Sequence, residues 1–161
     1  MYEREVKMRF LLFLAVWIIT AQAADETMLL GQWNSVTQSI NNGTRTTEKE
    51  YLKFYGDHTF EILFLVTVQK GNAYVKDLRI AGKGLWKTRG NILVVVVKNV
   101  EVPVAGEVYG ISNDSLRTIA STFHDRFKND PIRILVMKVL SPHKLVTENK
   151  EKQIVQYKQQ P

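Results

Sequence analysis

Turn-forming residues recur at short intervals along this chain and divide it into short apolar-rich runs. The stretches 41–43 (Asn-Asn-Gly), 70–72 (Lys-Gly-Asn) and 89–91 (Arg-Gly-Asn) supply the glycines and asparagines that tolerate the positive φ angles of tight hairpin turns. This punctuation predicts antiparallel strands joined by hairpins. A meander of such strands must close on itself, because exposed strand edges invite aggregation.

The runs between the turns have the residue types of strands. From Phe60 to Val68 every even position is apolar, which is the period of a strand with one buried face. Leu63 and Leu65 fall on the opposite face, which predicts that something covers the sheet there. The predicted strands are residues 32–40, 46–55, 59–68, 73–87, 92–100, 107–111, 132–140, 144–149 and 153–157.

One segment has helical periodicity. A capping cluster at 113–115 (Asn-Asp-Ser) precedes it, and Pro131 ends it. Its apolar stripe consists of Leu116, Ile119, Ala120, Phe123 and Phe127. The strand at 92–100 begins with a core that is apolar on both faces, so we expect this helix to cover its outer side. The sequence predicts a mainly β fold: an antiparallel up-and-down barrel of about 8–9 strands, with one helix at about 114–128 packed on or across it.

The first 23 residues have the features of a secretory signal peptide. A basic start (Arg4, Lys7, Arg9) precedes an apolar run at 10–19 and the tripeptide Ala-Gln-Ala at 21–23. The apolar run is shorter than the roughly 20 residues of a membrane-spanning helix. The alternative is an uncleaved anchor. We predict cleavage after Ala23, which leaves residues 24–161 as a single domain.

The composition favours some cellular compartments and classes of partner over others. The chain has no cysteine, so no lipid can be attached to one after the cleavage site, and no disulfide can form. A periplasmic or secreted bacterial protein fits this pattern better than a secreted eukaryotic domain. The net charge of +6 allows association with an anionic lipid surface or simply a solvated basic surface. No block of Arg and Lys with interleaved aromatic residues is present, which argues against a nucleic-acid partner.

No motif in the sequence predicts catalysis. A G-x-S-x-G elbow, a cysteine nucleophile and a glycine-rich phosphate loop are all absent. His58, His124 and His143 are scattered, and the only acidic neighbours, Asp57 and Asp125, are adjacent in sequence and so point in different directions. We therefore predict no catalytic residue, no metal site and no cofactor.

Several short motifs resemble those of small bacterial lipocalin-like domains. Gly-Gln-Trp at 31–33 is similar to the lipocalin G-x-W motif, and residues 54–60 (Phe-Tyr-Gly-Asp-His-Thr-Phe) resemble an F-x-x-D-G-T-F hairpin. Gly-Leu-Trp at 84–86, followed by Asn-Ile-Leu at 91–93, is similar to a second hairpin of that group. The resemblance implies a barrel with an apolar cavity. It also implies that Gly31 and Trp33 form the closed floor.

Two functions follow from a barrel of this kind. In the first, the barrel binds a small apolar or amphipathic ligand without catalysing a reaction. The candidate cavity residues are Phe60, Ile62, Phe64, Tyr74, Leu78, Ile80, Trp86 and Tyr109. In the alternative, the interior is filled and the barrel is a protein-interaction or inhibitor module of the bacterial envelope. A cavity of about 300 Å³ or more would favour the ligand, and a filled interior would favour the module.

Overall fold

A computed structural model of the chain describes residues 25–101 and 103–161. The predicted signal peptide lies outside the described residues. A short 3-10 helix comes first, and a single α-helix interrupts a series of strands. The elements are η1 (Glu26–Leu29), β1 (Gly31–Asn41), β2 (Thr44–Phe54), β3 (Thr59–Lys70), β4 (Ala73–Arg89), β5 (Ile92–Val100), β6 (Glu107–Tyr109), α2 (Asn113–Asn129), β7 (Ile132–Ser141), β8 (Lys144–Glu148) and β9 (Ile154–Gln159).

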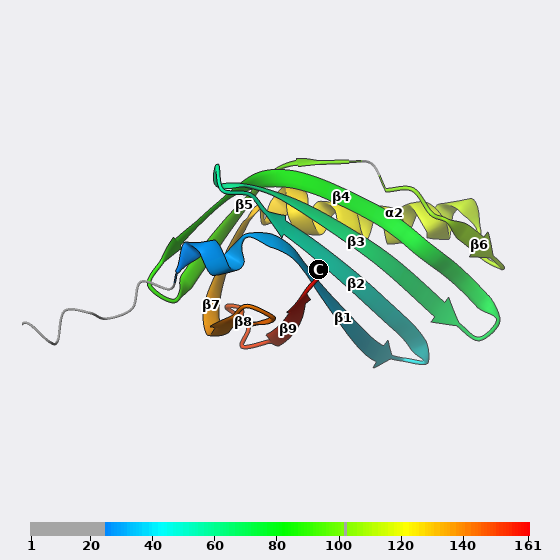
Figure 1. The fold of residues 1–161 in the computed structure, drawn as a ribbon. Helices are drawn as coiled ribbons and strands as arrows, with labels where there is room; N and C mark the ends of the chain where they lie inside the picture. Colours follow the sequence, from blue (N-terminus) through cyan, green and yellow to red (C-terminus); the bar gives the residue numbers. More distant parts are fainter. Residues whose placement is uncertain (1–24, 102) are drawn as a thin grey trace, which may run out of the picture.

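Eight of the strands form a closed antiparallel ring. Its order is β3-β2-β1-β9-β8-β7-β5-β4, and β4 pairs with β3 to complete it. The short strand β6 lies outside the ring, paired with the outer edge of β4. Strands β1–β4 are long and extend past the short strands β7–β9, and α2 lies along this extended part (Figure 1). The predicted fold class is confirmed, including the single helix.

The hairpin turns form where the sequence predicted them. Gly71 and Gly90 sit in the turns before β4 and β5 with φ angles of +58° and +59°. These angles are strained for residues with a Cβ atom, and glycine adopts them freely. The positions of the turns therefore fix the lengths of the strands on either side.

Gly84 lets the ring close tightly between β3 and β5. A Cβ atom at this position would lie 1.8 Å from the carbonyl oxygen of Val96 and 2.7 Å from Cε1 of Phe60. The pairing of β4 with β5 also shifts register at this point, between Lys83 and Gly84. The space left by the missing side chain is thus filled by the neighbouring backbone and by a buried ring.

The two ends of the barrel are closed in different ways. At one end η1 places Leu29 over Trp33, both fully buried, and the indole N–H of Trp33 donates to the carbonyl of Leu29 at 2.8 Å. At the other end α2 inserts Phe127, whose ring lies 5.0 Å from that of Phe64.

The expectation that the helix covers the outside of β5 is wrong. Phe127 of α2 joins the buried core, which also contains Phe64 and Val97, so the apolar stripe of the helix faces the barrel interior. Leu116, Ile119, Ala120 and Phe123 of the stripe pack against the same core and are partly buried. Among the described residues, the outer side of β5 therefore has no helix over it.

We predict that Gly84→Ala destabilises the protein severely, by about 3 kcal/mol or more, because the added methyl group overlaps backbone atoms that cannot move without breaking the β4–β5 pairing. Gly56→Ala is the matched control, since the nearest atom to its added Cβ is a Leu30 methyl at 3.9 Å. Urea unfolding followed by circular dichroism measures both. Equal stability of the two variants would contradict the assigned close contact.

Candidate functional site

Six of the predicted cavity residues lie together inside the barrel. They project from β3 and β4 and are at most 4% exposed. These residues are Phe60, Ile62, Phe64, Leu78, Ile80 and Trp86. The indole N–H of Trp86 donates to the carbonyl of Tyr55 at 3.1 Å, and its ring meets Phe54 edge-on at 5.4 Å.

The other two predicted cavity residues are elsewhere. Tyr74 and Tyr109 stack with ring centroids 5.8 Å apart on the β4–β6 pair, outside the ring, and Tyr109 is exposed. Tyr109 lies on β6, which is not part of the ring, whereas the cause for Tyr74 is a β-bulge: Val66 pairs with Leu78, but Val68 pairs with Val75, and Asp77 has a positive φ of 49°. The extra residue inverts the alternation of inward and outward side chains in the part of β4 that precedes it. Val75 is therefore buried, whereas the uninterrupted alternation predicted Tyr74 at this position.

The core where β3 and β4 meet α2 is filled. The gap among Ile62, Phe64, Ile80 and Phe127 leaves no volume for even one water molecule. A well-packed region of this kind holds no ligand unless a side chain moves. This part of the core therefore offers no ready space for a small molecule.

The end of the barrel beneath α2 is built from charged groups. Glu50 of β2 is only 6% exposed, and its two carboxylate oxygens accept hydrogen bonds from Arg133 of β7 at 3.0 Å and from the Tyr157 hydroxyl of β9 at 2.9 Å. The Arg133 guanidinium also lies over the rings of Phe64 and Phe127, at 5.8 and 5.7 Å. A buried carboxylate with these partners is fully compensated.

A cavity of about 290 Å³ opens beside this network, between the end of α2 and strands β7–β9. Arg126, Arg133, Leu135 and Tyr157 contribute to its wall. Arg126 also donates to Glu48 at 3.1 Å, so each arginine in the wall has a carboxylate partner. The cavity is small, and its charges are balanced by residues of this chain.

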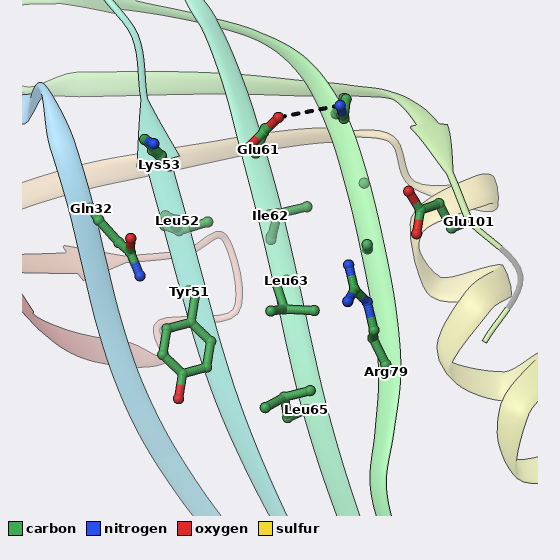
Figure 2. Close-up of a pocket in the computed structure, with 13 residues that line it drawn as sticks. Gln32, Tyr51, Leu52, Lys53, Glu61, Ile62, Leu63, Leu65, Arg79 and Glu101 are labelled. Carbon is green, nitrogen blue, oxygen red and sulfur yellow. Dashed lines mark ion pairs between the residues drawn. The ribbon is translucent and has the colours of Figure 1, made fainter. Parts of the chain in front are cut away.

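A larger hollow, of about 450 Å³, lies on the outside of β2, β3 and β4. Figure 2 shows Tyr51, Leu63 and Leu65 projecting from adjacent strands into it, with the Glu61–Lys83 ion pair (3.3 Å) at one end. Hydrogen bonding from Tyr55, followed by the interaction with Lys83, lowers the pKa of Glu61. Leu63 and Leu65, for which the sequence predicted a cover, are half-buried here and open to this hollow.

The outer side of β5 and β7, with Leu85 of β4 beside it, carries a contiguous apolar surface. Leu85 pairs with Val96, which pairs with Ile132, and Val94 pairs with Ile134. Ile132 and Ile134 are 52% and 56% exposed, and Leu85 is 40% exposed. We define the aliphatic face as Leu85, Ile92, Val94, Val96, Ile132, Ile134 and Val136. Isolated exposed apolar residues are ordinary, but a contiguous group marks an interaction site.

Part of this surface is predictable from the sequence. The run at 92–97 is apolar on both faces, but the sequence places Ile132, Ile134 and Val136 only in a strand and does not predict their position beside β5. The signal that could have found them is the even spacing of three β-branched residues, which indicates an apolar outer face on a second strand.

Residues 25–101 and 103–161 contain no group of three His, Cys, Asp or Glu side chains that could hold a metal ion. Within the same residues, no helix has the length and apolar character needed to cross a bilayer.

Comparison with known proteins leaves the family open. No model of a known protein family matches the chain, and no curated protein is significantly similar to it. The ring of eight strands fits the resemblance to lipocalin-like domains, but many families share barrels of this kind. Membership therefore stays a prediction.

Glu50 is predicted to hold the network beneath α2 together. Glu50→Ala leaves the Arg133 charge and the Tyr157 hydroxyl without their acceptor, so we expect a loss of about 3 kcal/mol, the lower end for buried pairs because a third of the Arg133 side chain is exposed. Glu48→Ala removes a more exposed pair with Arg126 and should cost under about 1 kcal/mol. Chemical denaturation of both variants measures the difference, and equal losses would refute the role of Glu50.

We also predict that the free energy of unfolding falls at high pH, because Tyr157 loses its proton more readily in the unfolded state. Burial, followed by the nearby Glu50 charge, raises the pKa of this phenol well above its ordinary value of 10 in the folded state. The resulting stabilisation is complete below pH 10 and is lost as the pH rises towards the folded-state pKa. Between pH 8 and pH 11, Tyr157→Phe should therefore lose less stability in urea unfolding than the unmodified protein. A Tyr109→Phe control should follow the unmodified protein, and parallel losses in all three would contradict this assignment.

Proposed function

We propose that this chain is an exported, non-enzymatic binding module that docks on the apolar surface of another protein through its aliphatic face. The observation that carries the proposal is a contiguous group of aliphatic side chains on the outer side of three neighbouring strands, of which Leu85, Ile132 and Ile134 are exposed and the others partly buried. Exposed residues such as Ile132 and Ile134 lower the solubility of a free protein and gain free energy when covered, at about 25 cal/mol per Å² of apolar area.

The filled core supports this module over a carrier that holds its ligand in the barrel. The six apolar residues expected to line a cavity pack against one another and against Phe127. Opening a ligand-sized space there would require α2 to withdraw Phe127 and expose the ion pairs beneath it.

The charges beside the aliphatic face favour a partner with carboxylates around its apolar surface. On the outer side of β4, Lys87 lies opposite Val94, and Arg89 lies opposite Ile92. Both cations are exposed, and neither forms an ion pair with the described residues. Acidic groups on the partner would meet this basic border.

A protein partner fits this face better than a lipid surface does. Six of its seven residues are Ile or Val, which are rigid and flat on a sheet and suit packing against another sheet or helix. The aromatic residues that anchor proteins at membrane interfaces are absent from it.

A small amphipathic ligand is the second candidate, and one observation favours it. The cavity of about 290 Å³ beneath α2 is close to the lower bound for ligand sites, and it combines the apolar Leu135 with the hydroxyl of Tyr157. Native mass spectrometry of the purified protein tests this candidate, since a bound molecule adds a defined mass that disappears after solvent extraction.

The docking proposal predicts that charge on the aliphatic face abolishes partner binding without unfolding the protein. Ile132→Lys and Ile134→Lys should each weaken the complex 10-fold or more, with a small effect on the melting temperature because both side chains are exposed. Val104→Lys, at an exposed aliphatic position beside Arg79 on the extended part of β4 and outside both the aliphatic face and β1, is the matched control.

The partner is first captured by photo-crosslinking from position 134 in envelope extract, identified, and purified. Calorimetric titration of that purified protein with the three variants then decides. Equal affinity of all three variants would overturn the proposal. Salt-dependent co-sedimentation with vesicles of anionic phospholipid, lost in Ile134→Lys, would replace it with a lipid surface.

A further inference from the structure

Strand β1 leaves the ring partway along its length. Its pairing with β9 consists of Trp33 with Gln159 and Asn34 with Lys158. Beyond Asn34 it continues to Asn41, paired only with β2 among the described residues. Residues 36–41 thus present a strand edge to solvent, and all six are exposed.

The opposite margin of the extended sheet is covered. There, β6 pairs with residues 74–76 of β4, and Val104 bridges to Arg79 by backbone hydrogen bonds of 2.8 and 3.2 Å. The chain therefore covers one open margin with its own backbone, and the β1 edge lacks such a cover among residues 25–101 and 103–161.

The β1 edge also lacks the usual protection against pairing. Natural edge strands carry lysine, proline or an inward-pointing charge. Between Asn34 and Thr44 this chain has no charged residue and no proline. Val36 and Ile40 are 61% and 71% exposed, and with Gln38 they project on the same side of the strand.

We propose that this edge pairs with the same edge of a second copy of the chain, in an antiparallel arrangement about a two-fold axis at Gln38. The backbone orientation supports this register. The carbonyl of Gln32 accepts from the amide of Gln160, so the backbone groups of Gln32 point away from β2. By the two-residue period of a strand, those of Val36, Gln38 and Ile40 point the same way.

The same register matches the side chains. With Gln38 opposite its own copy, Val36 lies opposite Ile40 of the second copy, and Ile40 opposite Val36. Each of these three pairs exchanges two backbone hydrogen bonds, about six in all. Two cross-strand aliphatic pairs then flank a central glutamine pair, which is the kind of contact that stabilises antiparallel strands.

Charge repulsion does not oppose this contact strongly. Lys49 and Arg45 of β2 lie next to Val36 and Ile40, but in the dimer the two β2 strands are three strand spacings apart, about 14 Å. That exceeds the screening length of about 8 Å at physiological salt. An edge-only interface is small, so we expect a dissociation constant in the micromolar range or weaker.

A single cysteine on the axis tests the register directly, since the chain has no native cysteine. Opposed residues in such a pair have Cα atoms about 5.5 Å apart, within the range of a disulfide. Gln38→Cys should therefore form a disulfide-linked dimer at least 10-fold faster under mild oxidation than Gln156→Cys, an equally exposed strand position on β9. Equal rates would overturn the proposal.

Complementary charges provide the second test. Val36→Lys with Ile40→Lys should be monomeric in sedimentation equilibrium at concentrations where the unmodified protein dimerises, as should Val36→Glu with Ile40→Glu. An equimolar mixture of the two double variants should restore the dimer, because each lysine then faces a glutamate. Both sites are exposed, so the fold is not at risk.

Three outcomes contradict the proposal: a monomer at all concentrations up to the millimolar range, double variants that dimerise on their own, or a mixture that stays monomeric. A monomer that binds an added extended peptide at this edge would assign it instead to a partner strand. This surface is separate from the aliphatic face, so its test stands or falls independently of the docking proposal.

Discussion

The seam between the first and last strands is the constraint on which the rest of the structure depends. It is short, with only two register pairs joining β1 to β9. Further hydrogen bonds extend it: the Gln160 amide donates to Gln32 at 2.8 Å, and the Gln159 side chain donates to Leu30 at 3.0 Å. Closing this seam brings Tyr157 to Glu50, residues 107 positions apart. Without this seam, Glu50 would lose the hydrogen bond from Tyr157 and keep only the one from Arg133.

The position of α2 explains why the outer side of β5 and β7 is uncovered among the described residues. The helix inserts Phe127 into one end of the ring, where Arg126 and Arg133 lie against the aromatic rings with their carboxylate partners. A helix held there cannot also cover β5. Since β5 is paired on both sides within the ring, its edges are satisfied, and no described helix covers the apolar outer row of β5 and β7.

Local features of the sequence predicted most of the fold. The surface depends on contacts between residues that are distant in sequence, and little of it was predicted. Turn glycines such as Gly71 and Gly90 fixed the strand ends, and the helical stripe ending at Phe127 fixed the helix. The alternation failed at Tyr74, because a one-residue bulge near Asp77 depends on the partner strand and leaves no local mark. The pairing of Glu50 with Arg133 was equally hidden, since it needs the completed ring.

The ring order has a consequence for how the protein engages other molecules. Counting in either direction, β5 is four strands away from β1, so the aliphatic face and the free part of β1 lie on opposite flanks. Two copies joined along β1 would present a pair of outward-facing contact surfaces pointing apart. Such a pair gains avidity on a partner displayed in arrays or in symmetric assemblies, where one contact raises the effective concentration for the next. On a partner molecule that offers a single binding site, the second contact surface adds no affinity.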